Sequence, residues 1–141
     1  MRRKRLQPII TEVFRRHDLL PSWGLAFALC ESNFRPWVVN RTGGDGLRGG
    51  AWGLFQMTAK TALGLGYNGP DSGLLEPDIN AEFAALLIGQ LNRRYHNLLD
   101  VAAAYNSGKM FALAPDWPTK PYARRVVAEQ ARYAAMDGVD T

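Results

Sequence analysis

Glu31 is the residue of this sequence best suited to acid–base chemistry. It directly follows the apolar segment AFALC (26–30), so we expect it at the C-terminal end of a buried helix. A carboxylate there loses hydration and faces the negative end of the helix dipole, and both effects raise its pKa. A carboxyl group that keeps its proton near neutral pH can act as a general acid. The alternative reading of the same residues is a structural glutamate that pairs with Arg35.

A second stretch whose residues could take part in chemistry is GAWGLFQ (50–56). Glycines weaken the interior of a strand, and large aromatic side chains are unusual in a surface loop. Trp52 and Phe55 could form apolar walls, Gln56 could supply an amide, and the glycines would let the backbone approach a ligand closely. Aromatic faces also suit the C–H faces of sugar rings. The alternative is a small hydrophobic cluster beneath a loop.

The third stretch is AAAYNSG (102–108), where three hydrogen-bonding side chains follow a run of alanines. Small residues allow a helix to pack closely, and the polar end formed by Tyr105, Asn106 and Ser107 could face a cleft. A capped core helix is the alternative.

Helices must position these groups, because strand patterns are nearly absent from the sequence. Apolar residues at helical spacing predict a first helix around Leu6–Phe14. We expect further helices over 21–35, 56–66, 78–96, 100–108 and 121–136, with Asp78 and Asp100 as N-caps. The glycine-rich segment 40–50 predicts a loop or a small irregular hairpin, and 67–77 predicts another loop. The expected fold is mostly α, with at most a small β region.

Composition indicates a single domain over residues 1–141. The chain is 47% hydrophobic and 21% charged, which argues against disorder, and its single cysteine, Cys30, cannot form an intramolecular disulfide. The net charge of +4 favours an anionic partner such as nucleic acid, a membrane surface or an acidic cell-wall polymer. The basic run Arg2–Arg5 is expected to be a solvated tail, and the alternative is a dedicated binding arm.

The sequence shows no sign of membrane insertion or export. No apolar run approaches the ~20 residues of a transmembrane helix. The segment after MRRKR carries one glutamate and two arginines where a signal peptide would be apolar, so we expect no secretion signal.

Taken in order, the motifs ESNF (31–34), GLFQ (53–56) and AYNSG (104–108) resemble the three signature motifs of the lytic transglycosylases. PYARRVV (121–127) looks like that family's later tyrosine motif, and the resemblance covers 23–133. It implies a lysozyme-like fold and cleavage of peptidoglycan glycan strands between N-acetylmuramic acid and N-acetylglucosamine.

In that family Glu31 would act first as acid and then as base. The N-acetyl group of the substrate assists in place of a protein nucleophile, and an anhydromuramic end forms. The resemblance implies that Tyr105 orients Glu31 or the substrate and that Tyr122 contacts Glu31. The implied substrate-binding residues are Ser32, Trp52, Phe55, Gln56, Asn106, Tyr122 and Asp45. Further stacking surface could come from Trp37, Tyr67 and Trp117, and the alternative is that these residues only pack.

The sequence also resembles goose-type lysozyme, which shares the fold and the acid but cleaves the bond with water. Asp45 lies where those enzymes keep one acidic residue, whereas Thr58 lies where they keep a second. In this alternative, Asp45 would activate the water. Outside the enzyme class, the alternatives are a non-catalytic cell-wall-binding module and a basic nucleic-acid-binding module.

No cofactor or metal is expected, since His17 and His96 are distant in sequence and there is one cysteine. We expect peptidoglycan as the partner, no nucleic acid, no stable membrane insertion and a monomeric state. A cell-wall enzyme without an export signal is expected to be a phage lysin or a virion-associated enzyme acting in the periplasm.

Overall fold

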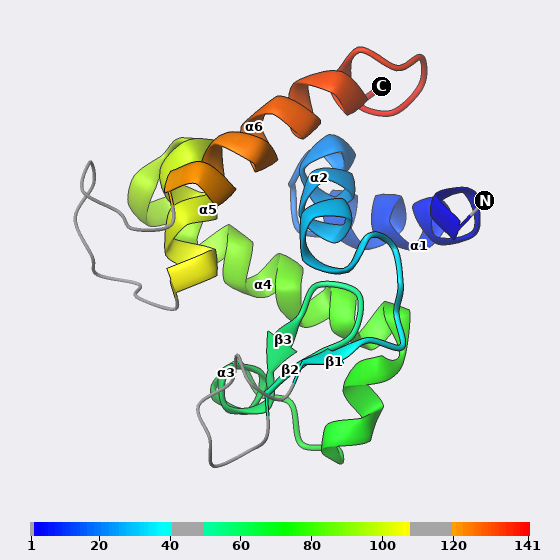
Figure 1. The fold of residues 1–141 in the computed structure, drawn as a ribbon, viewed down its shortest axis with the longest axis vertical. Coiled ribbons are helices and arrows are strands. Elements are labelled where there is room, and N and C mark those ends of the chain that lie inside the picture. Colours follow the sequence, from blue (N-terminus) through cyan, green and yellow to red (C-terminus); the bar gives the residue numbers. More distant parts are fainter. Residues whose placement is uncertain (1, 41–49, 108–119) are drawn as a thin grey trace.

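The computed structural model describes residues 2–40, 50–107 and 120–141, apart from the side chain of Lys120. This part of the chain is mainly helical and carries one small antiparallel sheet, as the sequence predicted (Figure 1). The helices are α1 (Arg2–Arg16), α2 (Pro21–Ser32), α3 (Ala59–Gly64), α4 (Pro77–Tyr95), α5 (Leu98–Ser107) and α6 (Lys120–Ala134), with a 3₁₀ turn η1 (Asp71–Leu75) before α4. The strands are β1 (Val39–Asn40), β2 (Ala51–Trp52) and β3 (Met57–Thr58).

The N-terminal basic residues are part of the folded domain, which differs from the expected tail. Helix α1 already begins at Arg2, and the guanidinium of Arg3 lies 5.6 Å from the centre of the Tyr133 ring on α6. The apolar face of α1 is buried, as its spacing predicted, through Leu6, Ile10, Val13 and Phe14. This face anchors α1 in the core, so the basic first turn is held at a defined place on the surface.

Helix α2 is the central helix of the core and packs against both α1 and α6 (Figure 1). It is apolar on all sides, the pattern of a buried helix. Gly24 allows the close approach of α1, because a Cβ atom there would lie only 2.5 Å from Cγ2 of Ile10. The helix ends at Ser32, four residues before Pro36, since Asn33 adopts a left-handed conformation and donates its N–H to the last turn.

The sequence predicted Asp78 and Asp100 as N-caps, and both predictions are wrong. Asp78 lies inside the first turn of α4, after Glu76 and Pro77, and stabilises the positive helix end through its charge. Asp100 lies inside the first turn of α5, and Asn97 accepts a hydrogen bond from its backbone N–H at 2.9 Å. Both aspartates follow better start signals, a proline at the first helical position and an asparagine cap.

A distant aspartate caps α2. Asp140, near the C-terminus, accepts hydrogen bonds from the backbone N–H and the hydroxyl of Ser22, at 2.8 and 2.6 Å. Gln130 of α6 donates to the same hydroxyl at 3.0 Å. The residue before the helix, Leu20, has no side chain able to serve as a cap. The segment after α6 therefore holds the start of the central helix.

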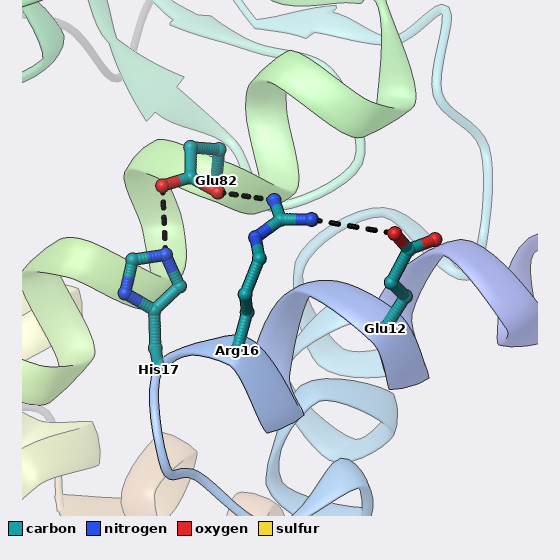
Figure 2. A network of polar contacts seen from close by, with 4 residues as sticks. All are labelled: Glu12, Arg16, His17 and Glu82. Atoms are coloured by element: carbon teal, nitrogen blue, oxygen red, sulfur yellow. Dashed lines mark hydrogen bonds and ion pairs between the residues drawn. The ribbon is translucent and has the colours of Figure 1, made fainter.

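Helices α1 and α4 are joined by a polar network around Glu82 (Figure 2). Arg16 and His17, at the end of α1, contact the two carboxylate oxygens of Glu82 at 2.6 and 2.7 Å. Burial alone would raise the pKa of Glu82, but the hydrogen bonds from Arg16 and His17 outweigh it and lower the pKa. Because a lowered pKa favours the folded state only while the carboxylate is ionised, this contact stabilises the protein at neutral pH and is lost on acidification.

Asn80 of α4 organises the turn between β2 and β3. Its side chain is fully buried, accepts a hydrogen bond from the N–H of Phe55 at 2.7 Å, and donates to the carbonyls of Trp52 and Leu74 at 2.8 Å each. Gly53 must be glycine here, since its φ is +77° and a Cβ atom would lie 2.5 Å from the Leu74 carbonyl oxygen. The turn 53–56 is thus fixed to α4 by one amide side chain.

We expect Asn80→Ala to destabilise the fold by about 3 kcal/mol or more, because it leaves three buried backbone groups without partners. Asn80→Asp keeps the acceptor and loses both donors, so it should also destabilise. Chemical denaturation would measure both effects, with Asn92→Ala on the same helix as the control. An Asn80→Ala protein as stable as the control would contradict this role.

Candidate active site

A pocket of about 400 Å³ opens where the end of α2, the sheet and the end of α5 meet. Polar and apolar side chains share its walls. The lining residues in the described part of the chain are Glu31, Asn40, Ala51, Gln56, Met57, Thr58, Thr61, Leu87, Leu91, Ala104, Tyr105, Asn106 and Ser107. The three sequence stretches singled out for their chemistry therefore all contribute to one pocket.

Glu31 lies in the last turn of α2 and lines this pocket. Burial raises the pKa of its carboxyl to about 7, and the hydrogen bond from the hydroxyl of Tyr122 on α6 partly counteracts that rise. The direction of the shift agrees with the sequence-based expectation. Arg35, the alternative partner for Glu31, donates its Nε–H to the Ser32 carbonyl at 2.8 Å. Glu31 is thus a carboxyl group that holds its proton for a substantial fraction of the time near neutral pH.

Tyr105 lines the pocket from α5, but its hydroxyl does not donate to Glu31. The hydroxyl donates to the backbone carbonyl of Phe55 at 2.6 Å, and the ring packs against Phe27 with centroids 5.0 Å apart. Burial, followed by the nearby charge of Glu31, raises the pKa of Tyr105 well above its usual value. The neutral hydroxyl therefore joins the end of α5 to the turn 53–56, close to the acid.

Gln56 occupies a tight turn at the pocket wall. Its backbone is left-handed, with φ of +53°, and its amide nitrogen donates to the carbonyls of Val38 and Gly53 at 3.1 and 3.0 Å. These bonds leave the side-chain carbonyl oxygen as the group that can accept from a ligand. Asn106 lines the same pocket from the exposed end of α5 and offers a second amide.

Three predicted substrate-binding side chains lie away from the pocket. The ring of Phe55 is fully buried in the core and stacks on Phe14 with centroids 5.6 Å apart. Trp52 follows the pocket-lining Ala51, and because successive side chains of a strand point to opposite faces, it packs instead into a cluster with Leu74.

The third such side chain is that of Ser32, which is 2% exposed. Its hydroxyl donates to the carbonyl of Leu54 at 2.8 Å and so connects α2 to the turn 53–56. Its role in the structure is to hold this turn against the helix that carries Glu31.

The remaining aromatic candidates for sugar stacking also lie outside the described pocket lining. Trp37 is 61% exposed and is not part of the pocket lining. Tyr67 packs edge-on against Phe83 and donates its hydroxyl to the Pro70 carbonyl at 2.5 Å. Asp45 and Trp117 lie outside the described residues.

Several lining residues were not singled out as binding residues from the sequence. Thr58 and Thr61 contribute hydroxyl groups at the start of α3, where Thr58 also caps the helix by accepting from the Thr61 N–H at 3.1 Å. Leu87 and Leu91 form an apolar floor from α4. Their spacing of four residues places both on one helix face, a signal that indicates a buried face but does not distinguish a core from a pocket floor.

The charged groups of the pocket are few. Within its described lining, Glu31 is the one carboxyl group, and the other chemically active groups are hydroxyls and amides. Among the described residues, no group of three or more His, Cys, Asp and Glu side chains could hold a metal ion. None of the helices described is both long and apolar enough to span a bilayer. The arrangement can supply one proton donor beside a polar, partly apolar pocket.

Comparison with protein families gives a match over residues 9–115, to the model described as the transglycosylase SLT domain. No curated protein sequence matches the chain significantly. The matched span is more than half of the 141 residues and contains Glu31, the turn 53–56 and the end of α5. With the single acid at the end of a buried helix and the pocket beside it, this match shows that the chain belongs to the transglycosylase SLT domain family of peptidoglycan-cleaving lytic transglycosylases.

Proposed function

We propose that the protein cleaves the bond between N-acetylmuramic acid and N-acetylglucosamine in peptidoglycan and leaves anhydromuramic ends. The observation that carries this proposal is the Glu31 carboxyl, which lines the pocket, has a pKa of about 7 and accepts a hydrogen bond from Tyr122. A group with this pKa can both give and take a proton near neutral pH.

In the first step, Glu31 donates its proton to the oxygen that links the two sugars, and the bond from C1 of the muramic ring to that oxygen breaks. Positive charge then develops on the muramic ring, as in glycoside cleavage generally. The N-acetyl group of the same sugar stabilises C1 in place of a protein nucleophile. Glu31 is left as a carboxylate, which the Tyr122 hydroxyl stabilises.

In the second step, Glu31 takes the proton from the hydroxymethyl group of the same muramic ring. The freed oxygen attacks C1, so an intramolecular C–O bond replaces the bond that was broken, and Glu31 regains its proton. No water is consumed. Because the nucleophile is already tethered to the ring, the step needs no second protein carboxylate to activate it.

Residues in and behind the pocket wall position the substrate and the acid. Tyr105 and Ser32 hold the turn 53–56 beside α2, since both donate to backbone carbonyls of that turn. The side-chain carbonyl of Gln56 and the amide of Asn106 are placed to hydrogen-bond sugar hydroxyl or acetamido groups. Leu87 and Leu91 offer apolar surface to the C–H face of a ring.

The described lining of the pocket favours the anhydro route over hydrolysis. An inverting hydrolase needs a second carboxylate, about 6.5–9.5 Å from the acid, to activate water. Thr58 occupies one position where goose-type lysozymes keep an acid, and a hydroxyl group cannot act as the base at neutral pH. Asp45, the other candidate, lies outside the described residues.

Glu31→Gln should abolish peptidoglycan cleavage while the fold is retained. The substitution keeps size and polarity but removes the transferable proton, and loss of general acid–base help typically costs ~100- to 10,000-fold. Release of soluble fragments from purified peptidoglycan measures the rate, and Glu12→Gln on the exposed face of α1 is the matched control. A folded Glu31→Gln protein with near wild-type activity would rule out the mechanism.

Tyr122→Phe should move the alkaline limb of the pH–rate profile to higher pH. The Tyr122 hydroxyl favours the ionised form of Glu31, so its removal raises the pKa of Glu31 above about 7 and extends the range in which the acid is protonated. The maximum rate should fall, because the acid loses an orienting partner. The profile of kcat against pH tests this, with Tyr67→Phe as the control, and an alkaline limb that stays in place or moves down would contradict it.

Mass spectrometry of the digestion products should find anhydromuramic ends as the main product, and Asp45→Asn should cause only a modest loss of rate. Both expectations follow from a nucleophile supplied by the substrate itself. Mainly reducing muramic ends, together with an Asp45→Asn loss as deep as that of Glu31→Gln, would instead identify a hydrolase of the goose-type lysozyme kind.

A further inference from the structure

The first turn of α1 has an unusual charge for its position. Arg2, Arg3, Lys4 and Arg5 follow one another there, and no acidic residue shares the turn. The N-terminal end of a helix carries partial positive charge, so cations at this end destabilise it. Several consecutive residues that go against the preference for acidic residues in a first helical turn are expected where the sequence serves a function other than stability.

Contacts to α2 and α6 hold the first turn of α1 in place, and its successive side chains point in different directions from the helix axis. Arg3 and Arg132 both lie over the ring of Tyr133, at 5.6 and 4.6 Å from its centre, and these contacts join the start of α1 to the end of α6. Lys4 and Arg5 are exposed, and neither has an ion-pair or hydrogen-bond partner among the residues that the structure describes. We call Arg2, Lys4, Arg5 and Arg132 the α1 cationic surface.

The negative charge near this surface includes Glu12, which lines a surface hollow together with Lys4. Glu129 is already bonded to Arg132 at 2.7 Å, and the turn after α6 carries the exposed Asp137. Arg132 is thus paired with Glu129, whereas the side chains of Lys4 and Arg5 are exposed. A partner with several anionic groups would relieve the repulsion among the cations of the first turn and the unfavourable helix dipole together.

The α1 cationic surface adjoins the catalytic helix without lining its pocket. Arg2 donates its Nε–H to the backbone carbonyl of Asn33 at 3.3 Å, and Asn33 ends α2 two residues after Glu31. Arg2 is thereby joined to the end of the helix that carries Glu31. None of the four cations belongs to the pocket lining.

We propose that the α1 cationic surface binds the free carboxylates of peptidoglycan stem peptides and holds the polymer while its glycan strand occupies the pocket. Arginine and lysine form strong charge-assisted hydrogen bonds with carboxylates. This proposal rests on peptidoglycan being the substrate, as proposed above.

The composition of the surface does not favour two other anionic partners. Insertion into a membrane surface requires exposed apolar side chains beside the cations, but the apolar residues of α1 face the core. The large exposed apolar residues of the described chain are Leu20, Trp37 and Leu63, none of them on α1. Single-stranded nucleic acid binds best where aromatic rings are free to stack, and Tyr133 is 2% exposed.

The test is binding of the inactive Glu31→Gln protein to insoluble peptidoglycan sacculi, so that the substrate is not consumed. On this background we expect Lys4→Glu/Arg5→Glu to weaken binding roughly tenfold at low salt, since two attractive contacts become repulsive. The difference should disappear at about 1 M salt, where charges are screened beyond ~3 Å. The melting temperature should not fall, because acidic residues suit the first turn of a helix.

Arg93→Glu/Arg94→Glu is the matched control, because it changes two adjacent exposed cations at the other end of a helix, α4, by the same charge. This control should change binding by less than about twofold. Insoluble chitin, a polymer of N-acetylglucosamine that carries no carboxylate, should bind the Lys4→Glu/Arg5→Glu protein and its parent equally.

Equal losses in the two double variants, or no loss in either, would overturn the proposal. It would also be overturned by a loss of the same size on chitin, or by one that appears on anionic lipid vesicles or DNA but not on sacculi. Wild-type cleavage with anhydromuramic products but no binding loss in Lys4→Glu/Arg5→Glu would contradict the surface alone. The expected binding loss together with a wild-type protein that does not cleave would support the surface and contradict the proposed catalysis.

Discussion

Burial of a single carboxyl group at the end of a buried helix is the constraint on which the rest of this structure depends. Removing an ionised carboxylate from water costs free energy, so burial raises the pKa of Glu31 to about 7. That environment exists only if α2 is enclosed by its neighbours and its last turn stays in place. Helices α1 and α6 enclose the helix, and contacts from distant parts of the chain hold its two ends.

In each of these contacts at the ends of α2, a side chain forms a hydrogen bond with a backbone group that is distant in the sequence. Asp140 accepts the Ser22 N–H at the start of α2, and Ser32 donates to the Leu54 carbonyl at its end. Tyr105 and Asn80 hold the turn 53–56 in the same way, each through a backbone group of Phe55. These bonds connect the turn to α2, α4 and α5 and so supply the rigidity that a binding wall needs.

Two glutamates with opposite pKa shifts illustrate how surroundings set the role of one residue type. Glu82 accepts hydrogen bonds from Arg16 and His17, which lower its pKa and make it a structural anion between α1 and α4 (Figure 2). Glu31 is more deeply buried and faces a neutral tyrosine hydroxyl, so desolvation dominates and its pKa rises. The difference between an anchor and a proton donor thus comes from the partners and not from the carboxyl group itself.

The sequence by itself determined the helices, the mostly α fold and the acid. Apolar spacing shows which face of a segment is buried, and it correctly placed Leu6–Phe14 and the long helix that ends at Tyr95. It also placed Glu31 at the end of a buried segment, from which the direction of its pKa shift follows. The contact between Tyr122 and Glu31 was expected only from family resemblance, and the structure contains it.

Only the tertiary structure decided which side of each turn faces the pocket and which distant groups pair. Phe55 turned into the core and Ala51 rather than Trp52 faced the pocket, although composition favoured the aromatic rings as walls. Asp140 became the cap of α2, and the basic start of the chain became the first turn of a helix. The local sequence pattern encodes periodicity and charge. The orientation of these side chains and the pairing of distant groups depend instead on which surfaces come into contact when the helices pack, and no short stretch of sequence determines those contacts.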